Sequence, residues 1–185
     1  MSFSSSLLRR VTIVIVGGTL VASSAGAATQ GSLGVNSTGT VSITASVAAR
    51  AQITGLTDVT FAAVDPTVAA SNAQNDCVWT NTLNRGYSIT ATGSGTASAF
   101  TLASSSSLTV PYSVQWSSST GQTSGTALTT GTAATGMTSL AANPTCSTAP
   151  STTSSLIIGI SSANLLTMTA TASYTGTLTL LITPQ

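Results

Sequence analysis

The sequence predicts an all-β sandwich, and three observations lead to that prediction. Apolar residues alternate with serine and threonine in several short runs, the pattern of strands with one buried face. Turn signals such as Asp65-Pro66 and Asn84-Arg85-Gly86 separate the runs. Residues 161–166 are the one stretch that fits a helix, of a turn or two. Short strands divided by turns are typical of a β-sandwich.

Residues 1–27 are expected to be a cleaved signal peptide. Arg9 and Arg10 precede a short apolar run over residues 11–22, and Ala25-Gly26-Ala27 supplies the small residues that signal peptidase needs. A membrane anchor is the alternative, but the run is well short of the roughly 20 apolar residues that span a bilayer. We therefore expect an exported chain that is not inserted in the membrane.

The first strand expected after the cleavage site covers residues 38–48. Its apolar residues all fall on one face, with serine and threonine on the other. These residues are Val41, Ile43, Ala45 and Val47. The alternation leaves open whether this face enters the chain's own core or that of a neighbouring copy.

Later strands are expected wherever the alternation returns. The runs lie at residues 59–63, 77–79, 87–91, 100–102, 108–116, 156–160 and 178–182. A turn at Gly55 precedes the first of them, and residues 67–75 are expected to form a loop. Residues 118–135 are expected to hold a weak strand and a hairpin.

Residues 108–116 carry the clearest alternation, with every apolar residue at an even position. Pro111 lies within this run and has no backbone donor, so the strand must be at an edge or contain a bulge there. At the end of the chain Leu178, Leu180 and Ile182 share one face.

Charged side chains are rare after residue 27, where the chain has no His, Lys or Glu. The charged residues there are Arg50, Asp58, Asp65, Asp76 and Arg85. The chain therefore lacks the basic stripe that binds nucleic acid and the polybasic segment that binds anionic lipid.

Low charge with much serine and threonine also fits a disordered stalk. Scarce proline and the two-residue period favour a folded protein, one that weak charge repulsion leaves prone to self-association.

Catalysis is not expected from this set of residues. A serine nucleophile needs a base, and no His or Lys follows residue 27. Asp58, Asp65 and Asp76 each lie near a turn, where aspartate is common for backbone reasons, and their spacing suggests no carboxylate pair. We predict that the protein is not an enzyme and has no cofactor.

Two binding sites are possible but less favoured. Asn72, Asn75 and Asp76 are close oxygen donors, yet a single carboxylate makes a poor calcium site, so no metal is expected. An aromatic sugar-binding platform is the second possibility. The aromatic residues fall on the same strand face as their aliphatic neighbours, so they are better interpreted as core residues. They are Trp79, Tyr87, Tyr112 and Trp116.

Cys77 and Cys146 are expected to form a disulfide, because an exported chain with one pair of cysteines favours that bond. Closing so long a loop stabilises a fold by roughly 4 kcal/mol in the chain-entropy model. Two thiols without histidine make a poor metal site.

Four stretches resemble a known family. Thr40-Val-Ser-Ile-Thr-Ala-Ser-Val47 is similar to the N-terminal extension of chaperone–usher pilus subunits, mainly of the archaic and alternative classes that include spore coat protein U-like domains. Residues 86–92 and 110–116 resemble the middle strands of these subunits, and residues 173–183 resemble the closing strand.

The resemblance implies an immunoglobulin-like sandwich that lacks its last strand, over residues 49–185, preceded by a donor strand within residues 28–48. A periplasmic chaperone fills the gap first, and the extension of the next subunit then replaces it at an outer-membrane usher. Val41, Ile43, Ala45 and Val47 would enter the groove of the next copy or of a homologous subunit. Leu178, Leu180 and Ile182 would line the groove.

The function implied is that of a structural subunit of a surface pilus, or fimbrium, serving adhesion or biofilm formation. The chain departs from the family in ending Pro184-Gln185, without the penultimate aromatic residue of better-known pilins, and in its Cys77–Cys146 pairing. The alternative is a self-contained secreted module that binds a glycan or a surface-coat protein, whose residues 41–47 pair within its own sheet.

Overall fold

The computed structural model describes residues 27–170 and 172–185, which divide into two units between Ser46 and Val47. The predicted signal peptide lies outside the described residues except for Ala27. In the first unit, Thr29 and Thr40 form an isolated antiparallel bridge through two hydrogen bonds of 2.9 Å. Residues 41–46 belong to no strand and are exposed.

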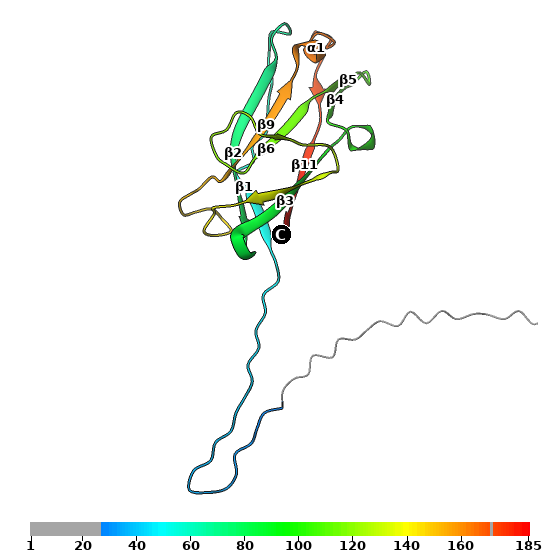
Figure 1. Ribbon diagram of the computed structural model, residues 1–185. Helices are drawn as coiled ribbons and strands as arrows, with labels where there is room; N and C mark the ends of the chain where they lie inside the picture. Colours follow the sequence, from blue (N-terminus) through cyan, green and yellow to red (C-terminus); the bar gives the residue numbers. More distant parts are fainter. Residues whose placement is uncertain (1–26, 171) are drawn as a thin grey trace, which may run out of the picture. The chain divides into compact units, whose positions relative to one another are not determined.

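The second unit, Val47–Gln185, consists mainly of antiparallel strands, which confirms the predicted all-β class (Figure 1). One sheet has the strand order β1-β2-β9-β6-β7. Its strands are β1 (Ala51–Thr54), β2 (Ala70–Thr80), β9 (Ser154–Ile160), β6 (Ser113–Ser117) and β7 (Thr126–Ala127).

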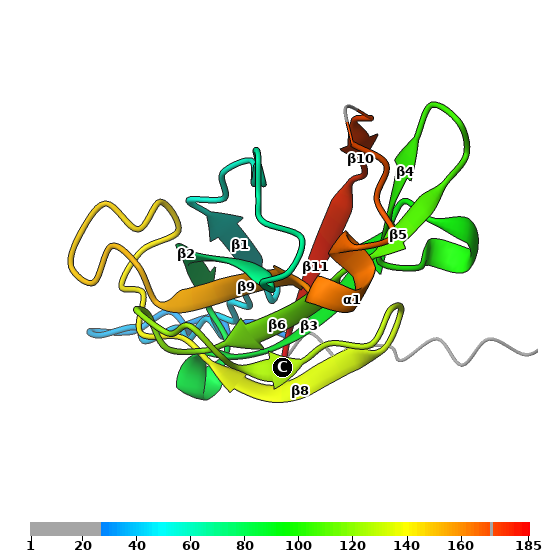
Figure 2. The same ribbon diagram turned by 90° about the horizontal axis from the view of Figure 1, so that it is seen from above.

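Two three-stranded sheets complete this unit. In the first, β3 (Gly86–Gly93) lies between β11 (Leu178–Pro184) and β8 (Ala133–Thr138). In the second, β4 (Thr101–Ser104) lies between β10 (Tyr174–Thr175) and β5 (Thr109–Pro111). The short helix α1 (Ser162–Leu165) lies beside β5, as Figure 2 shows, and confirms the helix of a turn or two expected at residues 161–166.

The core is formed by the inward faces of these sheets. Among its largest fully buried residues are Val78, Tyr87, Ile89, Trp116 and Ile160. The indole Nε1 of Trp116 donates a 3.0 Å hydrogen bond to the Tyr87 hydroxyl inside the core. Burial raises the pKa of Tyr87 to about 12, so this hydroxyl stays protonated. These two aromatic residues therefore belong to the core, as the alternation predicts.

The run at residues 108–116 forms two strands instead of one. The chain leaves the β4–β5 sheet at Pro111 and joins the five-stranded sheet at Ser113, with Tyr112 between them. The missing donor of Pro111 predicts such a break, because proline cannot continue a ladder on both sides. Alternation still holds across the break, since Val110, Tyr112 and Val114 are all buried.

Two predictions of secondary structure within the second unit were wrong. Residues 67–75 were expected to form a loop, yet β2 begins at Ala70 and pairs with β9 through Asp76. Residues 59–63 were expected to form a strand, but the structure places none there, and Ala63 has a positive φ of 49°. Pairing with β9 gives the polar residues of β2 a partner that local sequence does not reveal.

Asn81 continues the ladder between β1 and β2 beyond its last strand pair. Its backbone N–H donates to Arg50 O at 3.2 Å, and its Oδ1 accepts from Arg50 N–H at 2.6 Å. Its Nδ2 donates to Ala48 O at 2.8 Å. Asn81 thus holds Ala48 and Arg50, just before β1, through its backbone and its side chain.

Candidate functional site

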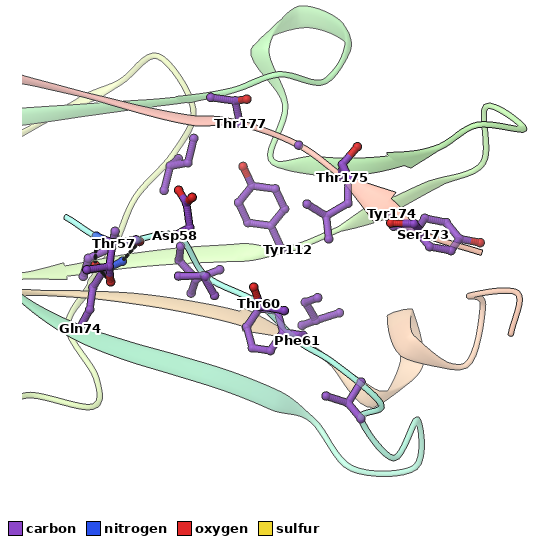
Figure 3. Close-up of a pocket in the computed structure, with 18 of the residues that line it drawn as sticks. Thr57, Asp58, Thr60, Phe61, Gln74, Tyr112, Ser173, Tyr174, Thr175 and Thr177 are labelled. Atoms are coloured by element: carbon purple, nitrogen blue, oxygen red, sulfur yellow. Dashed lines mark hydrogen bonds between the residues drawn. The ribbon is translucent and has the colours of Figure 1, made fainter. Parts of the chain in front are cut away.

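A groove of about 950 Å³ opens in the second unit between residues 56–64 and residues 172–180 (Figure 3). Its lining is mainly apolar. The apolar lining residues include Phe61, Val64, Leu102, Tyr112, Leu156, Ile158, Ile160, Leu165, Met168, Leu178 and Leu180. Its volume lies within the range of ligand-binding clefts in proteins.

One wall of the groove is the start of β11. Leu178 and Leu180 line the groove, as the resemblance led us to expect, whereas Ile182 packs against the core outside the groove lining. β11 pairs with β3 along one edge and is the outermost strand of its sheet. The other edge of β11 therefore carries backbone groups that no strand of the described chain pairs.

The opposite wall, residues 56–61, is held by a side chain. The Gln74 amide accepts from Thr57 N–H at 2.7 Å and donates to Thr57 O at 3.2 Å. Residues 56–64 form no backbone–backbone hydrogen bond within the described chain. Val59 and Phe61 are half-buried and line the groove. Apart from Thr57, whose N–H and C=O pair with the Gln74 side chain, this wall therefore carries backbone groups that are unpaired within the described chain.

Tyr112 stands between the two walls, with its hydroxyl toward the side of Thr177 (Figure 3). Its ring packs on Phe100 with the centroids 5.7 Å apart. The residue is only 8% exposed, and burial raises the pKa of its hydroxyl. The hydroxyl therefore stays protonated and able to donate a hydrogen bond.

Asp58 is the one charged residue that lines the groove. Asp65 lies in the following turn, where hydrogen bonds from the Thr67 hydroxyl and amide lower the pKa of the carboxyl. Asp76 is fully buried, and neither carboxyl oxygen has a hydrogen-bonding partner among the described residues. Burial raises the pKa of Asp76 to about 7, and the nearby backbone amide of Leu156 offsets this only in part.

The predicted disulfide is confirmed. Cys77 and Cys146 are bonded, with an S–S distance of 2.00 Å, and lie 69 positions apart in sequence. Both are buried against Ala141 and Trp79, so the bond ties the loop after β8 to β2. It lies in a cluster separate from the main core.

The residues predicted to form a donor strand are solvent-exposed. Val41, Ile43 and Val47 are exposed by 75%, 91% and 84%, and Ala45 is also exposed. The alternation predicted a half-buried strand, and the described residues 41–50 form none. A strand is stable only when it pairs with another strand. Because this segment is unpaired within the described chain, its apolar residues remain exposed.

The groove presents mainly apolar side chains, with Asp58 as its one charged residue. The described residues hold no group of three or more His, Cys, Asp or Glu that could bind a metal ion. Within that same part of the chain, no helix has the length and apolar character needed to cross a membrane. What the groove offers is apolar surface between two rows of backbone donors and acceptors.

Of the lining residues, sequence reasoning placed only Leu178 and Leu180 in a groove, and Gln74 and Tyr112 are two of those that it missed. Gln74 lies in the stretch expected to be a loop, and nothing in the local sequence signals its role. The assignment of Tyr112 to the core is confirmed by its burial, but its place in the groove lining was not predicted, although the adjacent Pro111 signals the break between β5 and β6.

No family model matches the sequence, and no curated protein matches it either.

Proposed function

We propose that the protein is a structural subunit of a surface fibre, in which an extended segment of one copy fills the groove of another. The observation that carries the proposal is the groove itself, with apolar residues between the unpaired edge of β11 and residues 58–61, whose backbone groups are unpaired within the described chain. An extended segment suits such a site best. Its backbone can hydrogen-bond to both walls while its side chains enter the groove.

The same chain carries a segment of the matching kind. Residues 41–47 alternate apolar and polar side chains, carry no charge and are exposed. The apolar face, formed by Val41, Ile43, Ala45 and Val47, suits the groove lining. Exposed apolar residues of this density are costly in water, which favours their burial in a partner.

The fold assigned under this proposal is an immunoglobulin-like sandwich that lacks one strand, the strand that would lie between β11 and residues 56–61. The inserted segment would join the two edges and close the sandwich. A resemblance to chaperone–usher pilus subunits supports this interpretation. In that case, a periplasmic chaperone and an outer-membrane usher are the partners, and the fibre at the cell surface serves adhesion or biofilm formation.

The experiment is a deletion of residues 28–48 from the exported chain. The deleted chain keeps the groove but has no segment to offer, so it should occupy one end of a fibre and never extend it. Electron microscopy of the cell surface should show fibres with the full chain and none with the deleted chain. Fibres of normal length from the deleted chain would refute the proposal.

A second measurement separates a fibre subunit from a self-contained binding module. The purified full chain should form concentration-dependent oligomers in light scattering, whereas a module that needs no partner strand stays monomeric at every concentration. Addition of a synthetic peptide of residues 38–48 should suppress the oligomers, because the peptide occupies the groove. A stable monomer indifferent to the peptide would favour the module.

A further inference from the structure

Building on the proposed function, we propose that the two ends of the second unit are complementary contact surfaces, so that one end of a copy docks on the opposite end of a second copy. The basic end consists of Arg50, Leu83, Arg85 and Leu140. The acidic end consists of Asp65, Val68 and Leu166.

The residues of the basic end are held together by hydrogen bonds. The N–H of Ser139 donates to Arg85 O at 3.1 Å, and Arg85 Nη1 donates to Leu140 O at 3.0 Å. The turn before β3 and the loop after β8 are therefore joined at Arg85. Arg50 is attached to the same turn, because its N–H donates to Asn81 Oδ1 at 2.6 Å. Both arginines are exposed.

Apolar surface accompanies these charges. Leu83 and Leu140 are both exposed. Gln185 also lies at this end, where its N–H donates to Gly86 O at 2.9 Å, and its carboxylate offsets one of the two guanidinium charges. The basic end thus combines a net positive charge with leucine side chains whose exposure to water is unfavourable.

The acidic end lies where β2 begins. The N–H of Val68 donates to Asp65 O at 3.2 Å, so both residues belong to the turn that leads into β2. α1 reaches the same end, because the last residue of β9 pairs with the first residue of β2 and α1 begins two residues later. Leu166 follows α1 directly, and both Leu166 and Val68 are exposed.

Asp65 is oriented for an external partner. Its Oδ1 accepts both hydrogen bonds from Thr67, from the N–H at 2.9 Å and from the hydroxyl at 2.7 Å. These bonds fix the carboxylate and leave Oδ2 for a donor on another molecule. They also lower the pKa of Asp65, so the carboxylate is charged at neutral pH.

β2 keeps the two ends apart. It runs from one to the other over 11 residues, which is roughly 33 Å of extended chain. Figure 1 shows α1 and the end of the chain marked C at opposite ends of the second unit. Asp65 therefore cannot reach Arg50 or Arg85 of its own copy, and these opposite charges meet only between two copies.

Charge fixes the orientation of the contact. Two basic ends, or two acidic ends, would bring like charges together. Unlike ends bring Asp65 to a guanidinium group and place aliphatic side chains on both sides. Exposed ion pairs add little affinity, but they select orientation. Because the two surfaces differ, the contact repeats from copy to copy and builds a chain of copies instead of a two-fold dimer.

Cross-linking tests the contact directly, because the chain has no lysine. The variant Arg50→Lys/Arg85→Lys keeps both charges and supplies side-chain amines only at the basic end. A carbodiimide joins an amine to a carboxylate in direct contact. It should link these two positions to Asp65 in assembled protein but not in dilute monomer, as mass spectrometry of the digested product can show. Assembled protein without a link to Asp65 would overturn the proposal.

A charge variant tests the acidic end. Val68→Lys places a positive charge beside Asp65 on an exposed side chain. The concentration at which half of the protein is assembled, measured by light scattering, should rise about fivefold, the equivalent of one good exposed ion pair. Thr126→Lys is the matched control, because Thr126 is exposed, is similar in size to valine and lies level with the middle of β2.

The control variant should change the half-assembly concentration less than about twofold. Equal effects of Val68→Lys and Thr126→Lys would contradict a contact at the acidic end. Circular dichroism checks the fold of each variant. If Val68→Lys unfolds, the cross-link to Asp65 still decides the question, since that variant leaves the acidic end unchanged.

The outcomes separate this contact from the proposed function. If the wild-type chain does not assemble, the fibre proposal and the contact both fail. If it assembles without a link to Asp65, the contact fails while the fibre proposal stands. Sedimentation of the monomer with vesicles of anionic phospholipid, lost in Arg50→Gln/Arg85→Gln, would assign the basic end to a lipid surface and overturn the contact.

Discussion

Asp76 should make the folded protein more stable in acid than at neutral pH. The carboxyl is fully buried on β2 with both oxygens unpartnered among the described residues. Burial raises its pKa from 3.8 to about 7. The strands on either side of β2, namely β1 and β9, contain no ionisable residue that could stabilise the charged form. Ionisation therefore places an uncompensated charge inside the protein.

The size and sign of the Asp76 contribution to the free energy of unfolding follow from this pKa shift. A difference of about three pKa units corresponds to about 4 kcal/mol. Between pH 3.8 and 7 the folded state binds this proton and the unfolded state has lost it. The stabilisation of the folded state by protonated Asp76 is therefore fully present below about pH 4. It falls as pH rises and is gone above about pH 7.

The perturbation is Asp76→Asn, which keeps the shape and removes the charge. Urea unfolding at several pH values from 3 to 8 gives the free energy of unfolding. We expect the wild type to lose up to about 4 kcal/mol across that range and the variant to lose much less, so that the variant is the more stable at pH 8.

Asp65→Asn is the control. Hydrogen bonds from Thr67 lower the pKa of Asp65, so its replacement removes a pH dependence of opposite sign and leaves the fall between pH 4 and 7 in place. The reasoning is refuted if the wild-type free energy is constant or rises over that interval, or if Asp76→Asn keeps the wild-type slope.

Three further predictions concern the core and the groove. Replacing both disulfide cysteines by serine should lower the free energy of unfolding by about 4 kcal/mol, measured by urea unfolding, because the bond closes a loop between residues 69 apart in sequence. Tyr87→Phe leaves the buried Trp116 N–H without its acceptor and should cost about 1–3 kcal/mol in the same assay. Gln74→Ala removes the side chain that pairs with Thr57, so the amide of Thr57 should exchange hydrogen faster while amides of β9 stay protected; unchanged exchange would show that Gln74 does not hold this wall.

Much of the fold could be predicted from local alternation. The strand at residues 178–182 and the disulfide were predicted correctly, because an amphipathic face and a cysteine pair are visible in the sequence. The N-terminal half of β2 could not be predicted, since its residues are polar and depend on pairing with β9. The groove was predicted only on the β11 side, through Leu178 and Leu180.

The rest of the groove depends on strand pairing and on side-chain contacts between distant residues, which the local sequence does not reveal. Residues 59–61 alternate as a strand does, and alternation cannot tell a paired edge from an unpaired one. Likewise, the interaction of Gln74 with Thr57 joins residues 17 apart through side-chain geometry alone. Such positions are set by the packed chain as a whole.

Asn81 has a mechanical consequence if copies are joined end to end through residues 41–47. Tension on that segment enters the second unit at residues 48–50, which Asn81 holds by three hydrogen bonds. Just beyond lies β1, with four residues paired along β2. A pull along β1 loads the Asn81 hydrogen bonds and the hydrogen bonds between β1 and β2 at the same time, in shear. These hydrogen bonds then do not open one after another. Asn81→Ala should therefore lower the force at which a single molecule, pulled by its N-terminal segment, begins to lose β1.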